Sequence, residues 1–529
     1  MVCRVAAAQA IPVREADTKC ALCHSQIFQN YLATPMANAS GLATEQLRPA
    51  TFMHTASSIE YKITIRDHVG VLSYRATSVP GVARELPLNY FLGSGHLGTT
   101  YLYSVGDYLF ESPVAWYAAS QHYDMKPGLA ELGHMPPPLP MQSGCVRCHM
   151  SAVQPNDSGT LNRYSDVPFK QTGITCEACH GDSGRHGITN GKEPIVNPAR
   201  LKADLRDSIC VSCHLEGDVS VERAGLSILN FRPGESISTY MTYYVRAGAN
   251  PTDRGVSEVE QLSQSTCKRA SGDRMSCTSC HNPHFTPDAS HQAAFFRGKC
   301  LACHSQPGFA KAHHPENEDC TSCHMPRTSA VNILHVAWTD HRILRLPEAI
   351  KANPQAKERG ELTPIFSPSA TKRDQAMANY QALLDGDRSL ESTAWGQLNA
   401  QRELIVNDKE ALDALGTLSA ERGDFPAAEQ AFRRVLELDS VDLTALSNLG
   451  TLLAKQGKLK ESLSLLLVAF GRNQDIPALA KNLARVQCMA GDGSGARTTL
   501  NTALIYCPDL EDVRRLLTQM GNCGGGNGK

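Results

Sequence analysis

The last third of the chain carries a hydrophobic pattern that repeats every 34 residues. A leucine followed by a small residue recurs three times, at Leu415-Gly416, Leu449-Gly450 and Leu483-Ala484. Three further positions keep the same register: glycine at Gly423, Gly457 and Gly491, a small residue at Ala428, Ser462 and Ala496, and a large apolar residue at Phe432, Leu466 and Leu500. A period of this length is that of a helix–turn–helix unit.

This spacing is the tetratricopeptide signature, and it predicts a helical repeat region over residues 373–520. Residues 374–408 are expected to form a degenerate first repeat, Leu510–Met520 a capping helix, and 521–529 a flexible tail. Such repeats stack into a superhelix whose concave groove commonly binds peptide or protein. A generic array of helical hairpins is the alternative, but a register held over three units favours the repeat.

Strand patterns are confined to one part of the N-terminal region. Ile59–Ile65 and Val71–Ala76 alternate or cluster β-forming residues around a polar turn, and Tyr101–Tyr103 and Tyr108–Phe110 flank the turn Gly106-Asp107. We therefore expect a small β-containing insertion over residues 51–113. Residues 345–372 contain four prolines and several charges and are predicted to be a linker.

Cysteine spacing supplies the candidate chemistry. Fourteen of the 19 cysteines fall in seven C-x-x-C-H motifs, which we number 1 to 7 in chain order. The motifs are Cys20-Cys23-His24, Cys145-Cys148-His149, Cys176-Cys179-His180, Cys210-Cys213-His214, Cys277-Cys280-His281, Cys300-Cys303-His304 and Cys320-Cys323-His324. In such a motif the two thiols form thioethers with one haem, and the histidine binds the iron as proximal ligand.

Zinc binding, disulfide bonding and thiol redox chemistry account less well for this cysteine spacing. A structural zinc ion usually takes two C-x-x-C pairs, and seven pairs is an odd number. Zinc would also not require a histidine after every pair. A disulfide framework would not repeat a single spacing, and a redox C-x-x-C would occur once, near a βαβ pattern. The sequence therefore predicts seven covalently bound haems c.

Motifs 2 to 7 are crowded, so little regular structure fits between them and the porphyrins must form much of the interior. We expect a mostly α-helical fold with extensive irregular loops. It would comprise a haem-cored cytochrome domain over 18–344, the small β-containing insertion, and an α-helical tetratricopeptide solenoid.

The twelve remaining histidines are candidate distal ligands, and all precede residue 342. A second strong ligand makes an iron a low-spin electron carrier, whereas an open position allows small-molecule chemistry. The favoured distal ligands are His186, His284, His335 and His341, followed by His54, His96 and His313. His134 and His314 rank with the second group, and His68, His122 and His291 rank below it.

Composition excludes several function classes. The formal net charge is -2, so no basic field indicates nucleic-acid binding. The longest apolar stretches are too short for a transmembrane helix. Ala8-Gln9-Ala10 resembles a signal-peptide cleavage site, so residues 1–17 are expected to be a signal remnant or a disordered tail.

Several segments carry a family resemblance. They are Gly93-Ser94-Gly95-His96, Cys176–Gly181, Ile195–Pro198, Phe231–Gly234, Cys277–His284 and Thr339–Ile343. The chain resembles tetratricopeptide-containing multihaem cytochromes, related to the tetrahaem electron carriers of nitrifiers and to the hydroxylamine oxidoreductase superfamily. The resemblance implies stacked haem pairs, mostly bis-histidine irons, and a periplasmic or extracellular location, because haem is attached outside the cytoplasm.

Two functions follow as expectations. The first is electron transfer to redox partner proteins, with the repeats used for docking or for assembly into a homo-oligomer or an extracellular conductive filament. The second is an oxidoreductase that acts on a small nitrogen or sulfur compound at one open iron. A third reading treats the haems as structural and the repeats as a scaffold. The confinement of the free histidines to the haem-bearing region favours a carrier over an enzyme.

Overall fold

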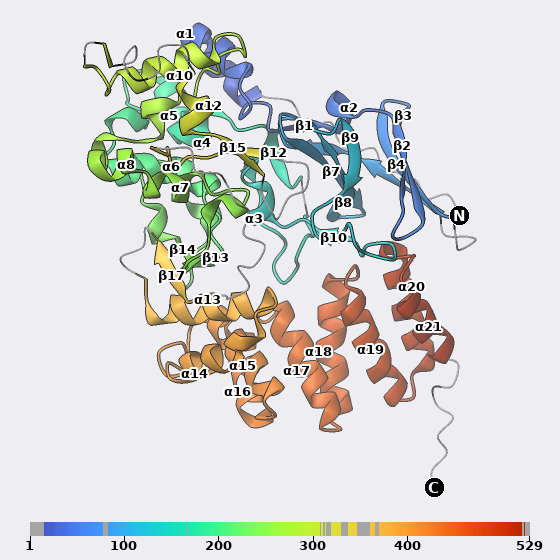
Figure 1. The fold of residues 1–529 in the computed structure, drawn as a ribbon. Coiled ribbons are helices and arrows are strands. Elements are labelled where there is room, and N and C mark those ends of the chain that lie inside the picture. Colours follow the sequence, from blue (N-terminus) through green and yellow to red (C-terminus); the bar gives the residue numbers. More distant parts are fainter. Residues whose placement is uncertain are drawn as a thin grey trace.

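The computed structural model describes residues 15–77, 83–165, 167–306, 308–309, 313, 319–329, 337–345, 360–365, 370–520 and 523. Three parts are distinguished in Figure 1: short helices with the haem motifs at the upper left, two β-sheets at the upper right, and a helical solenoid beneath both. Predictions for residues 1–14, for His314 and His335, for most of the linker and for most of the tail fall outside the described residues.

The β part consists of two antiparallel sheets. One runs in the order β2–β3–β4–β5 and the other in the order β1–β6–β7–β8–β10, with β9 also paired to β8. The strands are β1 (Ser40–Leu42), β2 (Ala50–His54), β3 (Ile59–Arg66), β4 (Val69–Ala76), β5 (Ala83–Leu88), β6 (Tyr90–Leu92), β7 (Gly98–Val105), β8 (Tyr108–Tyr117), β9 (His122–Met125) and β10 (Leu139–Pro140). The β part is therefore larger than the expected 51–113.

The two sheets share a core rich in aromatic residues. Tyr61, Tyr101 and Phe110 are almost completely buried in it. Strand β3 pairs with β4 through the turn at Asp67-His68, and both residues have positive φ. The β part therefore has a hydrophobic core made of its own side chains.

The cytochrome part is built from short helices and small sheets. Its helices are α1 (Glu15–Leu32), α3 (Ser143–Val146), α4 (Cys176–His180), α5 (Gly184–Ile188), α6 (Ala203–His214), α7 (Glu258–Gln264), α8 (Thr266–Ser271), α9 (Cys277–Cys280), α10 (Gln292–Leu301) and α12 (Cys320–His324). Strands β11 (Met150–Val153) and β12 (Phe169–Thr172) pair, as do β15 (Arg327–Ser329) and β16 (Ala337–Thr339).

The solenoid is a run of antiparallel helix pairs. Its helices are α13 (Lys372–Leu384), α14 (Glu391–Asn399), α15 (Lys409–Glu421), α16 (Phe425–Leu438), α17 (Leu443–Lys455), α18 (Leu459–Arg472), α19 (Pro477–Met489), α20 (Gly493–Tyr506) and α21 (Glu511–Gln519). A Cβ on Gly416 would lie 2.7 Å from the Phe432 ring, and a Cβ on Gly450 would lie 2.7 Å from Leu466. The small residue that follows the recurring leucine thus marks where paired helices touch.

A third sheet joins the solenoid to the cytochrome part. Strands β13 (Val219–Glu222), β14 (Met241–Arg246) and β17 (Leu362–Ile365) pair antiparallel, so part of the predicted linker is a strand. Alternate residues of β14 face opposite sides, as in any strand. Tyr243 packs with Val211 of α6 and with Leu215, which directly follows this helix, and Tyr244 packs with Ala378 and Ala382 of α13.

Candidate haem-binding site

All seven motifs lie on or beside short helices, within α1, α4, α6, α9, α10 and α12 or following α3. A helical C-x-x-C places both sulfurs on one side, with the histidine just beyond them. The residues of α4, α5, α9, α10 and α12 are not buried by protein. These helices therefore have little protein core of their own, which fits a group that packs against them.

Four proximal histidines face a second imidazole. The ring centres are 6.4 Å apart for His24 and His186, and 5.8 Å for His180 and His284. They are 6.2 Å apart for His281 and His341, and 5.9 Å for His324 and His313. The planes of the paired rings differ by 10° to 29°.

These separations suit an iron between the rings. A metal–imidazole bond is about 2 Å long and the ring centre lies about 1 Å behind the nitrogen, so opposed ligands have centres about 6 Å apart. Two imidazoles that stack directly on each other do not require a centre-to-centre distance of about 6 Å. Among the described residues, no three histidine, cysteine or carboxylate side chains converge as a separate metal site. The donor set therefore fits paired axial ligands.

Hydrogen bonds determine which nitrogen of each histidine ring is available to bind iron. The Nδ1 atoms of several paired rings donate to backbone carbonyls: His180 to Val196 at 2.8 Å, His186 to Glu193 at 2.7 Å, His324 to Leu344 at 2.5 Å, and His341 to Thr339 at 2.8 Å. An Nδ1–H that donates leaves Nε2 as the lone-pair nitrogen. All four rings thus present Nε2 as the ligand atom.

Burial keeps imidazoles neutral around this region. It lowers the pKa of His149, and burial together with His180 lowers the pKa of His284. A neutral imidazole keeps the lone pair that metal binding requires. At neutral pH these two histidines are therefore in the form that can bind iron.

Cysteines from different motifs lie side by side. Four sulfur pairs are within hydrogen-bonding reach: Cys20 with Cys176, Cys148 with Cys213, Cys210 with Cys277, and Cys300 with Cys320. Cys179 also lies near Cys213, and Cys280 near Cys303. Motif adjacency therefore follows the order 1–3–4–5–6–7, and motif 2 joins at motif 4.

Two predicted ligands are not brought to a proximal histidine. In His54, Nδ1 lies 2.7 Å from Ser57 Oγ and Nε2 lies 2.8 Å from the carbonyl of Ala130. With both nitrogens engaged inside the β part, His54 does not fit the predicted ligand role. His96 is exposed on the loop between β6 and β7, and no proximal ring in the described part of the chain is paired with it.

Lower-ranked histidines are oriented by local contacts. His122 and His134 each bond a neighbouring carbonyl through Nδ1, and His291 pairs with Asp288 at 2.8 Å. His149, His214 and His304 face no second imidazole among the described residues, while His314 and His335 lie outside that set.

The sequence patterns missed one covalent bond. Cys488 of α19 and Cys523 form a disulfide that ties the chain after α21 to the last repeat. No spacing rule singled out this pair. Cys523 lies in the segment predicted to be a tail, and Cys507 is nearer to Cys488 in the sequence, so no local signal indicated the pairing.

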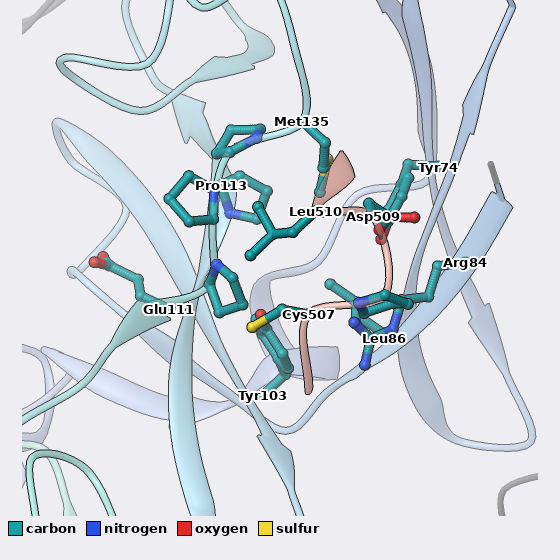
Figure 2. Close-up of a pocket in the computed structure, with 14 residues that line it drawn as sticks. Tyr74, Arg84, Leu86, Tyr103, Glu111, Pro113, Met135, Cys507, Asp509 and Leu510 are labelled. Atoms are coloured by element: carbon teal, nitrogen blue, oxygen red, sulfur yellow. Dashed lines mark hydrogen bonds between the residues drawn. The ribbon is translucent and has the colours of Figure 1, made fainter. Parts of the chain in front are cut away.

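A small cavity lies where the β part meets the last repeat (Figure 2). Tyr74, Arg84, Met135, Cys507 and Asp509 are among the residues that line it, and its volume is about 30 Å³. A cavity of that size holds about one water molecule. It is therefore a gap in an interface and not a substrate pocket.

Comparisons with known proteins are consistent with this geometry. The family model described as "Cytochrome c554 and c-prime" matches residues 119–181, and a tetratricopeptide repeat model matches residues 443–474. Multiheme cytochrome MtrA of Shewanella baltica (strain OS185) is 26% identical over 194 residues, covering 33% of this chain and 56% of that protein. The chain thus spans a little over half the length of that relative.

Two solved structures are also similar. Outer cell wall cytochrome OcwA has a TM-score of 0.40 at 12% identity, covering 86% of this chain and 99% of that one. MamA from Desulfovibrio magneticus RS-1 has a TM-score of 0.26 at 20% identity, covering 29% of this chain and 85% of that one. The described residues include no helix that is long and apolar enough to cross a membrane. The cytochrome family match, the MtrA relative and the matched repeat together support a multihaem cytochrome with C-terminal tetratricopeptide repeats.

Proposed function

We propose that the protein carries electrons along seven covalently bound haems c, in the order of motif adjacency. The observation that carries this proposal is the set of four imidazole pairs at 5.8 to 6.4 Å. Bound haem c supplies a one-electron iron couple whose potential the axial ligands tune. Imidazoles on both faces favour electron transfer over substrate binding at those four irons.

The assigned distal ligands are His186 for motif 1, His284 for motif 3, His341 for motif 5 and His313 for motif 7. Adjacent cysteines support an electron path 1–3–4–5–6–7 with a branch from motif 4 to motif 2. His284 follows His281 by three residues. One short segment would therefore supply the proximal ligand of motif 5 and the distal ligand of motif 3.

Export is part of the proposal. The Cys488–Cys523 disulfide fits an oxidising compartment, where such bonds persist. The repeat region is proposed to dock redox partners or further copies of the chain, because tetratricopeptide solenoids present an extended concave surface.

His186→Ala tests both the haem string and the ligand assignment. Thioethers would still hold the haem of motif 1, so the haem content should remain seven per chain. One haem should change from low-spin to high-spin in the electron paramagnetic resonance spectrum, because one axial ligand is lost. The matched control is His291→Ala, since His291 is exposed and paired with Asp288.

An unchanged spectrum for His186→Ala would reject its assignment, and fewer than seven haems in the wild type would reject the count. The second function expected from the sequence is catalysis at one open iron. Catalysis at an open iron predicts a high-spin haem in the wild-type protein, with a spectrum that responds to a small added ligand.

A further inference from the structure

Arg147 stands at the junction of motifs 2 and 4. It is the second residue between the cysteines of motif 2, and its Nη1 donates a hydrogen bond to the carbonyl of Ser212, which lies between the cysteines of motif 4. Cys148 and Cys213 are within hydrogen-bonding reach of each other at the same place. One side chain of motif 2 is therefore anchored on the backbone of motif 4.

Other half-buried arginines in this region are neutralised. Arg254 pairs with Asp218 at 2.8 Å and also with Glu260, and Arg223 pairs with Asp374. Among the described residues, Arg147 bonds the Ser212 carbonyl and forms no ion pair with a carboxylate. Its guanidinium is thus a positive charge held by a neutral carbonyl.

The surroundings of Arg147 are poorly solvated on the side of β14. Ser212 is 8% exposed and Tyr243 is 2% exposed, and the Tyr243 hydroxyl has no hydrogen-bond partner among the described residues. Tyr243 packs against Val211 of the motif 4 helix and against Leu215, which directly follows that helix. In so dry a setting the field of a fixed charge is weakly screened.

We propose that Arg147 raises the reduction potentials of the haems at motifs 2 and 4, so that electrons entering the string collect at its branch point. Reduction takes up one electron and lowers the positive charge of the iron, and a nearby fixed cation favours the lower charge. The inference rests on the proposed electron-transfer function. Arg147 acts here as a positioning and tuning residue that does not touch a reacting atom.

The test is spectroelectrochemical titration of the full-length holoprotein carrying Arg147→Gln or Arg147→Lys. In Arg147→Gln two of the haem transitions should shift to more negative potential, while the other five stay in place. Arg147→Lys keeps the charge and should show a smaller shift. The matched control is Arg185→Gln, because Arg185 also neighbours a proposed iron ligand but is exposed and paired with Glu193.

Haem content, measured on every variant, separates this inference from the function on which it rests. A titration of Arg147→Gln that superimposes on the wild type overturns the tuning role while leaving electron transfer intact. An equal shift of all haems, or equal loss of haem in the Gln and Lys variants, also overturns it and assigns Arg147 a packing role. Absence of reversible reduction in the wild type would reject the proposed function itself.

Discussion

At the scale of single residues, a hydrogen bond at the second ring nitrogen orients four of the paired histidines. His186 bonds the carbonyl of Glu193 and His180 bonds that of Val196, so segments outside the motifs aim both rings. His54 bonds at both nitrogens and so has none left. Hydrogen bonding therefore separates candidates that look alike in the sequence.

Asp475 shows the cost of a buried charge between the solenoid and the β part. It is 4% exposed, and burial raises the pKa of its carboxyl to about 6. The side chain of Asn162 lies near the carboxylate and offsets only part of this rise. Because the folded-state pKa lies above the unfolded value of about 4, folding favours the protonated form and stability falls as pH rises from about 4 to about 6.

Asp475→Asn should therefore stabilise the protein by about 3 kcal/mol at pH 7. The gain should disappear at pH 3, which lies below both pKa values, so that the wild-type carboxyl is largely protonated in the folded and the unfolded state. Thermal unfolding followed by circular dichroism at the two pH values measures the difference in stability between the variant and the wild type. Asp385→Asn, at an exposed helix end, is the control and should change neither profile. A gain of equal size at both pH values would contradict the explanation.

The cysteines and proximal histidines could be predicted from the sequence, but the pairing of proximal with distal histidines could not. The C-x-x-C-H spacing is local, so it identifies cysteines and proximal histidines wherever they occur. His186 reaches His24 only because the chain folds back across two intervening motifs. Neither that contact nor the position of Arg147 against Ser212 is encoded in local spacing.

At the scale of secondary structure, the repeat register is explained by helix contact. Gly450 lies on α17 where Leu466 of α18 approaches it, and Gly457 has a φ of +77° in the turn between them. The first position needs a missing side chain, and the second needs the conformational freedom of glycine. The 34-residue period was therefore predictable, because it reflects local packing.

Gly450→Ala should destabilise the solenoid by about 1–3 kcal/mol, because the added Cβ would lie 2.7 Å from Leu466 and the helices must separate. Chemical denaturation monitored by circular dichroism measures the loss. Gly471→Ala is the matched control, since a Cβ there meets no atom within 4 Å. It should be neutral or slightly stabilising. Equal losses in both variants would show that helix approach is not the cause.

The extent of the β part was harder to predict. Strands β8, β9 and β10 continue the sheet well beyond residue 113, and β9 and β10 are short pieces held by neighbours. Strand β17 owes its conformation to β14, which lies far away in the sequence. Short strands of this kind have weak local signals, because tertiary pairing decides their conformation.

At the scale of the whole molecule, the solenoid is joined firmly to the remainder. Arg373 of α13 donates to the carbonyl of Glu222 in β13 at 2.6 Å and pairs with Asp408 at 2.7 Å. At the far end, Arg84 donates to the carbonyl of Tyr506 and Tyr74 to Asp509. Figure 1 shows the solenoid running beneath both other parts.

Arg373→Met should destabilise the protein by about 3–5 kcal/mol, because it leaves the buried Asp408 without its partner. Small-angle scattering should also show a larger radius if the solenoid separates from the sheet. Arg515→Met removes an exposed pair with Glu511 and should cost less than about 1 kcal/mol. A matching small effect at Arg373 would mean that the junction depends on apolar contacts alone.

The imidazole pairs also have a consequence for biogenesis. Motifs 2 and 3 lie between His24 and His186 in the sequence. His180 pairs with His284, which is synthesised later, directly after motif 5. Motif 1 is synthesised first, but its second histidine ligand is synthesised only after motifs 2 and 3. With this arrangement, the thioether bonds to an early haem would form before its iron gains a second histidine ligand. Maturation would pass through forms in which early haems are bound yet hold only one histidine.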